Sequence, residues 1–141
     1  MSIDRAVSAI GLGLTAALGA AVVAGAMDRS PEPLVVPIEI RYSHFEPAAI
    51  RVPAGRPITF VITNGDPIDH EWIVGDAAVH DRHRTGTEPD HAARPTEVSI
   101  EAGREIRTTV TFATPGSLAF VCHLPGHEAY GMTGTLEVSG G

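Results

Sequence analysis

The stretch GSLAFVCHLPGHEAYGMTGTLEV, residues 116–138, carries three kinds of metal-binding side chain between two predicted strands. Cys122, His127 and Met132 follow one another at intervals of five residues. A thiolate, an imidazole and a thioether together suit copper, which accepts all three donors. One further imidazole would complete a trigonal site of two histidines and one cysteine with a weak axial methionine. The stretch therefore indicates a copper site at one end of a β-structure.

The best candidate for the missing imidazole is His70. It comes after the turn at Asn64–Ile68 and opens the predicted strand Glu71–Val74. A side chain at the start of a strand can point past the end of a sheet, where the last two strands could also bring the Cys122 segment. His70 is therefore the fourth candidate ligand.

Short segments rich in β-branched residues alternate with turns over the rest of the chain. Glycine (15 residues) and proline (11 residues) are plentiful, and aromatic residues make up only 5%. The predicted strands cover Leu34–Arg41, Ile50–Val52, Pro57–Thr63, Glu71–Val74, Glu97–Ile100, Glu105–Phe112, Gly116–Cys122 and Gly134–Val138. Short strands separated by turn residues predict an all-β sandwich or barrel.

Residues 75–95 interrupt this pattern. Asp76 is placed to cap the start of a short helix that runs to about Arg84, with Gly86 after its end. The remainder of the insertion is polar and predicts a loop. Because the strand Glu71–Val74 runs away from His70, we expect the insertion to lie far from the copper.

The insertion contains His80, His83 and His91 among several acidic residues. His80 and His83 would share one face of the predicted helix, since residues three apart are neighbours there. One interpretation is a second, weaker site for copper or zinc. The other is a solvated polar loop.

Composition excludes several classes of function. The 141 residues amount to about one domain. Ten basic and seventeen acidic residues give a net charge of -7. An acidic chain without a basic run predicts no nucleic-acid partner. The single cysteine excludes an internal disulfide and any metal centre that needs two cysteines.

The N-terminal segment points to export. No charged residue occurs from Ala6 to Met27, and Ala24-Gly25-Ala26 resembles a signal cleavage site. Residues 1–27 are thus predicted to be either a cleaved signal peptide or an uncleaved membrane-anchoring helix, the chain's only expected membrane contact. Residues 28–33 are predicted to form a linker. The domain at 34–141 is expected in the periplasm or outside the cell.

From about Val35 to Val138 the chain resembles the cupredoxins, the single-domain blue copper proteins. The matching pieces are Phe45-Glu-Pro47, Val52-Pro-Ala-Gly55, Phe60-Val-Ile-Thr-Asn64, Asp69-His-Glu71, Gly103, Phe120-Val-Cys-His-Leu-Pro-Gly-His127 and Gly131-Met-Thr-Gly134. The resemblance implies a Greek-key β-sandwich. It also implies one type 1 copper per chain, with His70, Cys122, His127 and Met132 as ligands.

The spacing from Cys122 to Met132 also matches cupredoxin domains of multicopper oxidases. Those oxidases carry His-x-His pairs for a trinuclear copper cluster, and this chain has no such pair. Val121 precedes the cysteine and only His123 follows it. We therefore expect that the protein is not an enzyme. Strand alternation predicts that His123 points away from the metal.

The resemblance implies a one-electron carrier that cycles between Cu(I) and Cu(II). Its partner would be a redox protein, which the net charge of -7 predicts to be basic. The electron would pass through the edge of His127. Two alternatives are open. One is a copper-binding protein that stores, delivers or buffers copper without a redox partner, and the other is an accessory domain without copper.

Overall fold

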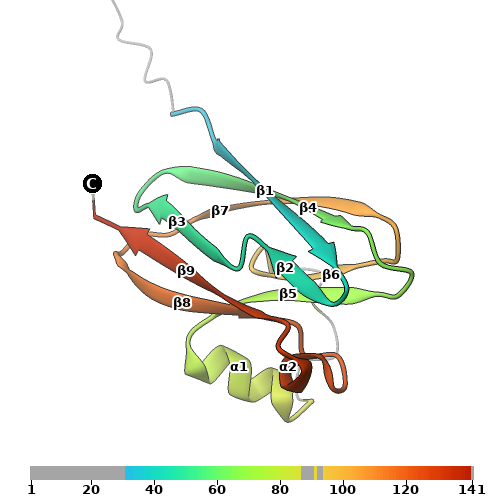
Figure 1. The fold of residues 1–141 in the computed structure, drawn as a ribbon. Helices are drawn as coiled ribbons and strands as arrows, with labels where there is room; N and C mark the ends of the chain where they lie inside the picture. Colours follow the sequence, from blue (N-terminus) through green and yellow to red (C-terminus); the bar gives the residue numbers. More distant parts are fainter. Residues whose placement is uncertain (1–30, 87–90, 92–93, 141) are drawn as a thin grey trace, which may run out of the picture.

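Four strands form the first β-sheet of the computed structural model, which describes residues 31–86, 91 and 94–140 (Figure 1). They are β1 (Leu34–Arg41), β2 (His44–Glu46), β4 (Pro57–Asn64) and β7 (Glu105–Thr111). Their order in the sheet is β2-β1-β4-β7. The central pair β1 and β4 is parallel, and β2 and β7 add antiparallel at the two edges.

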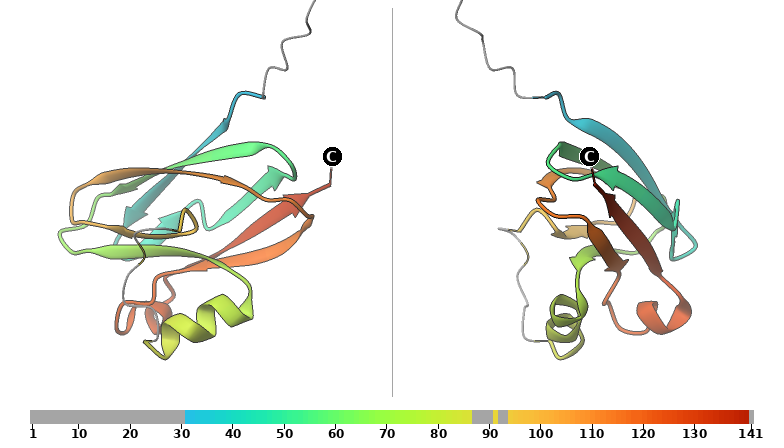
Figure 2. Two further views of the ribbon diagram at one scale, coloured as in Figure 1. Left: turned by 180° about the vertical axis from the view of Figure 1, so that it is seen from behind. Right: turned by 90° about the vertical axis from the view of Figure 1, so that its left-hand side faces the viewer.

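Five strands form the second sheet, which faces the first (Figures 1 and 2). They are β3 (Ala49–Pro53), β5 (His70–Gly75), β6 (Glu97–Ile100), β8 (Gly116–Val121) and β9 (Thr133–Ser139). Their order is β3-β9-β8-β5-β6. The chain crosses repeatedly between the two sheets, and this confirms the predicted β-sandwich.

The core lies between the sheets and is built by alternation along the strands. Phe60, Trp72 and Phe120 are its largest fully buried side chains. The Phe60 and Trp72 rings join the two sheets, with their centroids 4.7 Å apart. A Cβ on Gly134 would overlap the Phe120 ring, so β9 needs glycine at this position to pack against β8.

All eight predicted strands are present. The bounds of β1 and β6 match the prediction, and each of the other predicted strands differs by one residue at one end or at both ends. Two elements were missed: β2 and the four-residue helix α2 (His127–Tyr130). Both are too short to show a period in the sequence.

The insertion contains the predicted helix, α1 (Ala77–Arg84). Asp76 caps it as expected, because its Oδ1 accepts the backbone N–H of Val79 at 3.1 Å. The expectation that the insertion lies far from the predicted copper ligands was wrong. Helix α1 folds back along the outer face of the second sheet, and its end reaches α2 (Figure 2). There Arg84 Nε donates to Glu128 Oε2 at 2.9 Å.

The predicted export segment at residues 1–27 lies outside the described residues, as does the first half of the linker at 28–33. Among the residues that the structure describes, no helix is long and apolar enough to cross a membrane.

Candidate metal centre

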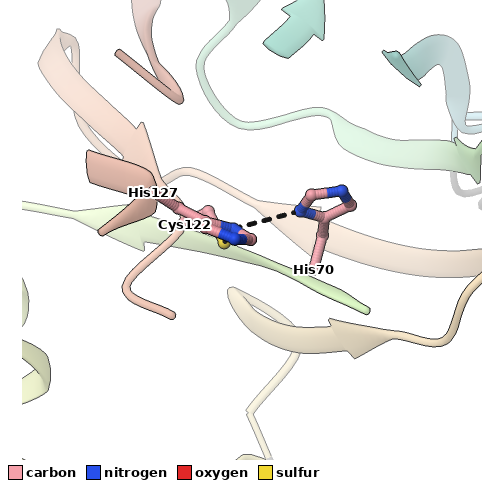
Figure 3. Close-up of side chains that lie close together, drawn as sticks. All are labelled: His70, Cys122 and His127. Atoms are coloured by element: carbon pink, nitrogen blue, oxygen red, sulfur yellow. Dashed lines mark hydrogen bonds between the residues drawn. The ribbon is translucent and has the colours of Figure 1, made fainter. Parts of the chain in front are cut away.

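Three of the four predicted ligands meet at one end of the second sheet: His70, Cys122 and His127 (Figure 3). His127 Nδ1 lies 3.3 Å from His70 Nδ1 and 3.2 Å from Cys122 Sγ. The ligand atoms of the three residues lie within 4.8 Å of one another. Bonds of roughly 2.0–2.3 Å to nitrogen and sulfur would let a single transition-metal ion contact all three.

The strand pairing explains why these residues meet. Strand β5 runs antiparallel to β8, with Ile73 opposite Val121, so the start of β5 lies beside the end of β8. His70 is the first residue of β5, and Cys122 directly follows β8. The chain then turns through α2, whose first residue is His127 and which is flanked by Gly126 (φ 87°) and Gly131 (φ 106°). Glycine adopts these left-handed conformations without a steric cost.

Met132 closes the loop that carries Cys122 and His127. Its backbone N–H donates to the carbonyl of His127 at 3.0 Å, and its carbonyl accepts the N–H of Cys122 at 3.1 Å. Its side chain is fully buried. The backbone thus places Met132 beside two of the other candidates, and its role as an axial ligand stays a prediction.

Asp66 fixes the orientation of His70. The Nε2–H of the buried His70 donates to Asp66 Oδ2 at 3.0 Å. In the neutral ring this leaves Nδ1 as a lone pair that faces His127 and Cys122. Burial lowers the pKa of His70, although Asp66 acts in the opposite direction. A neutral imidazole held by a carboxylate is the usual arrangement of a histidine that binds metal.

Asp66 is itself held by the loop before β2. Its two oxygens accept the backbone N–H groups of Tyr42 and Ser43, each at 2.7 Å. Both residues have positive φ, near 54°, which is uncommon for residues other than glycine. Burial acts to raise the pKa of Asp66, but the hydrogen bonds from Ser43, Tyr42 and His70 outweigh it and hold the pKa below its ordinary value. Asp66 is therefore an anion that ties the first sheet to His70.

Cys122 lies in an apolar environment with one directed hydrogen bond. Burial raises the pKa of its thiol, partly offset by the backbone N–H of Glu71, which donates to Sγ at 3.3 Å. A buried thiol with a raised pKa is inert unless a cation replaces its proton. Hydrogen bonds and hydrophobic packing around such a sulfur tune the potential of copper sites.

The three histidines of the insertion do not gather as one group. His80 Nδ1 lies 3.0 Å from His123 Nε2, and His80 Nε2 lies 3.2 Å from the carbonyl oxygen of Gly75. His83 and His91 instead meet Glu97 of β6, with their ligand atoms within 4.8 Å of one another. His123 points away from the candidate copper ligands and stacks on His83, as strand alternation predicts.

The comparisons with known proteins agree with this centre. Residues 35–139 match the family of copper binding proteins described as plastocyanin/azurin. The chain belongs to this family. The copper-resistant cuproprotein CopI of Pseudomonas aeruginosa is 32% identical over 127 residues, which cover 67% of this chain and 70% of that protein. The CopI of Rubrivivax gelatinosus is 36% identical over 98 residues, and the match covers 67% of this chain and 59% of that protein.

A solved structure supports the fold of this family member. The auracyanin of Roseiflexus castenholzii superposes with a TM-score of 0.63 at 22% identity, covering 74% of this chain and 96% of that chain. The predicted cupredoxin-type sandwich is therefore confirmed.

Sequence reasoning missed the residues that support the ligands. Asn64 and Asp66 both looked like ordinary residues of the turn that follows the predicted strand Pro57–Thr63. The Asn64 side chain donates to the carbonyls of Ile68 and Glu101 and accepts the N–H of Asp66. No local pattern distinguishes such residues from ordinary turn residues, because their partners lie in other parts of the chain.

Proposed function

We propose that this protein binds copper outside the cytoplasm and serves in copper handling, most directly in resistance to excess copper. Its family supports copper as the metal, and two relatives carry the name copper-resistant cuproprotein. The observation that carries the proposal is the convergence of His70, Cys122 and His127, with the imidazole of His70 already oriented by Asp66. The apolar N-terminal segment supports export.

The residues fit copper on chemical grounds. One thiol and two imidazoles converge, and a buried thioether lies next to them in the chain, which is the donor set of a type 1 site. A copper ion bound there would supply Cu(I)/Cu(II) chemistry. His70 and Cys122 are fully buried, so they keep water from the ion, and the hydrogen bond between Asp66 and His70 fixes one imidazole in place.

A second candidate function is one-electron transfer to a partner protein. It is favoured by His127, which is partly exposed while the other candidate ligands are buried. An imidazole that joins a buried metal to the surface is a short route for an electron. The net charge of -7 would favour a basic partner.

The primary test is copper loading of the purified chain, comparing wild type with Cys122→Ser. Wild type should bind Cu²⁺ at this centre with an intense charge-transfer absorption in the visible range, and the variant should lose that band. Equal colour in both proteins would exclude a cysteine-bound copper. A matched control is His44→Ala, which removes an exposed histidine outside the centre.

Growth under copper stress separates the two functions. Expression of wild type with its N-terminal segment should raise the copper concentration that a sensitive host tolerates, and Cys122→Ser should not. Protection without rapid, reversible voltammetry would support copper handling. Fast reversible voltammetry without protection would support the electron carrier instead. Sequencing the N-terminus of soluble and membrane fractions tests the export proposal.

A further inference from the structure

A second group of buried donors lies on the outer face of the second sheet. Successive side chains of a strand point to opposite faces. Trp72 of β5 faces the core, so Glu71 and Ile73 face outward, and Glu97 of β6 pairs with Ile73 on that outer face. The insertion covers this face and brings His83 and His91 to Glu97. The group is therefore separate from the centre formed by His70, Cys122 and His127.

His83 has a nitrogen that is buried and aimed at the carboxylate. Its Nδ1–H donates to the carbonyl of Val79 at 2.8 Å, which leaves Nε2 as a lone pair in the neutral ring. This Nε2 lies 3.4 Å from Glu97 Oε2 in a side chain that is only 2% exposed. Within the described part of the chain it has no hydrogen-bond partner. A lone pair that faces a carboxylate oxygen in a buried place is unfavourable unless a cation, either a proton or a metal ion, lies between them.

His91 repeats this arrangement from the other side. Its Nε2–H donates to Glu71 Oε1 at 3.1 Å, so Nδ1 is the lone pair of the neutral ring. Nδ1 lies 4.0 Å from the same Glu97 Oε2 and likewise has no hydrogen-bond partner among the described residues. A carboxylate that orients a histidine through its far nitrogen is typical of metal sites. Glu71 holds this position here.

We propose that His83, His91 and Glu97 form a second metal site for a borderline divalent ion of the Cu²⁺ or Zn²⁺ class. Two imidazoles and one carboxylate are a common ligand set for these ions. In a tetrahedral site with bonds of about 2.0–2.1 Å, neighbouring ligand atoms are about 3.4 Å apart. The separation of 3.4 Å between His83 and Glu97 fits this value, and His91 needs a small movement inward.

The charges around the site allow an ion to bind. Glu97 Oε2 accepts from Arg94 Nη1 at 2.8 Å, and Oε1 from Arg82 Nη2 at 3.4 Å. A carboxylate offers about four lone-pair positions, so Oε2 keeps one for a metal. The carboxylate of Glu71 adds a second negative charge behind His91. The competing explanation is an ion-pair network in which Glu97 serves only the two arginines.

The test uses the full chain with its type 1 centre filled by one equivalent of Cu²⁺, so that added Zn²⁺ reports on the second site. Zn²⁺ retained after equilibrium dialysis is measured by mass spectrometry. Wild type should hold one Zn²⁺ per chain with its visible absorption unchanged, and its melting temperature should rise with Zn²⁺. His83→Ala, His91→Ala and Glu97→Gln should each weaken Zn²⁺ binding by at least about ten-fold, since loss of even an outer partner costs 10–100-fold.

His44→Ala is the matched control and should bind Zn²⁺ like wild type. The visible band reports on folding, so a variant that keeps the band but loses Zn²⁺ binding supports the site. Three variants are used so that the test still holds if one of them fails to fold. No retained Zn²⁺ in wild type would overturn the proposal in favour of the ion-pair network. Equal retention in folded variants and wild type would also overturn it. If copper-loaded wild type showed no visible band, that result would count against the proposed type 1 centre and not against this second site.

Discussion

Replacing Asp66 by asparagine should weaken both the fold and the metal centre. The two carboxylate oxygens accept three donors: the N–H groups of Tyr42 and Ser43 at 2.7 Å and the Nε2–H of His70 at 3.0 Å. Asparagine has one oxygen, and its NH₂ group would face at least one of these donors. One unpaired donor in this largely buried place costs about 1–3 kcal/mol. We therefore expect the copper-free variant to lose about that much free energy of unfolding.

The same change should reduce copper affinity. Loss of the carboxylate that orients a metal-binding histidine typically lowers metal affinity by about 10–100-fold. Urea denaturation of the copper-free protein measures the first effect, and competition with a copper chelator measures the second.

Asp69→Asn is the matched control, because Asp69 is exposed and accepts only the N–H of Ala102 among the described hydrogen bonds. If Asp66→Asn behaved like Asp69→Asn in both assays, the proposed role of Asp66 would be refuted.

Three further predictions concern packing, pH and metal loading. Gly134→Ala should cost about 1–3 kcal/mol in urea denaturation, because its Cβ would overlap the Phe120 ring, while Gly116→Ala, which meets nothing nearby, should have little effect. The pKa of Asp66 is held below its ordinary 3.8, so its stabilising effect is complete above that pH and is lost as the pH falls through the lower folded-state value. The difference in unfolding free energy between copper-free wild type and Asp66→Asn should therefore stay constant from about pH 7 to about pH 5 and shrink below about pH 4. Copper at a free concentration of 100 times its dissociation constant should stabilise wild type by about 2.7 kcal/mol in thermal unfolding, and Cys122→Ser by much less.

The strands could be predicted from the sequence because their signals are local. Leu34–Arg41 alternates buried and exposed residues near its end, and glycine or proline turns bound most other strands. The proximity of the candidate ligands on one loop could also be predicted, since Cys122, His127 and Met132 are close in sequence. His70 needed an argument about strand ends, and the pairing of β5 with β8 brings it to Cys122.

The surroundings of the ligands could not be predicted in the same way. The path of the insertion depends on α1 packing against the outer face of β5. The sequence of the helix does not predict which surface of the sandwich it packs against. Its apolar face is weak, and the contact of Arg84 with Glu128 joins residues 44 positions apart. Asp66 likewise acts through Tyr42 and Ser43, whose positive φ values have no signature in these residue types.

Two neighbouring residues at the end of β8, Cys122 and His123, point to opposite faces of the second sheet. Cys122 belongs to the buried core, whereas the next residue, His123, stacks on His83 of the insertion. A shift of one residue in the pairing of a strand turns every side chain to the other face. Deleting a single residue within β8 would thus carry the thiol toward the insertion and an imidazole toward the core. The identity of each donor set depends on the length of one strand as much as on the residues themselves.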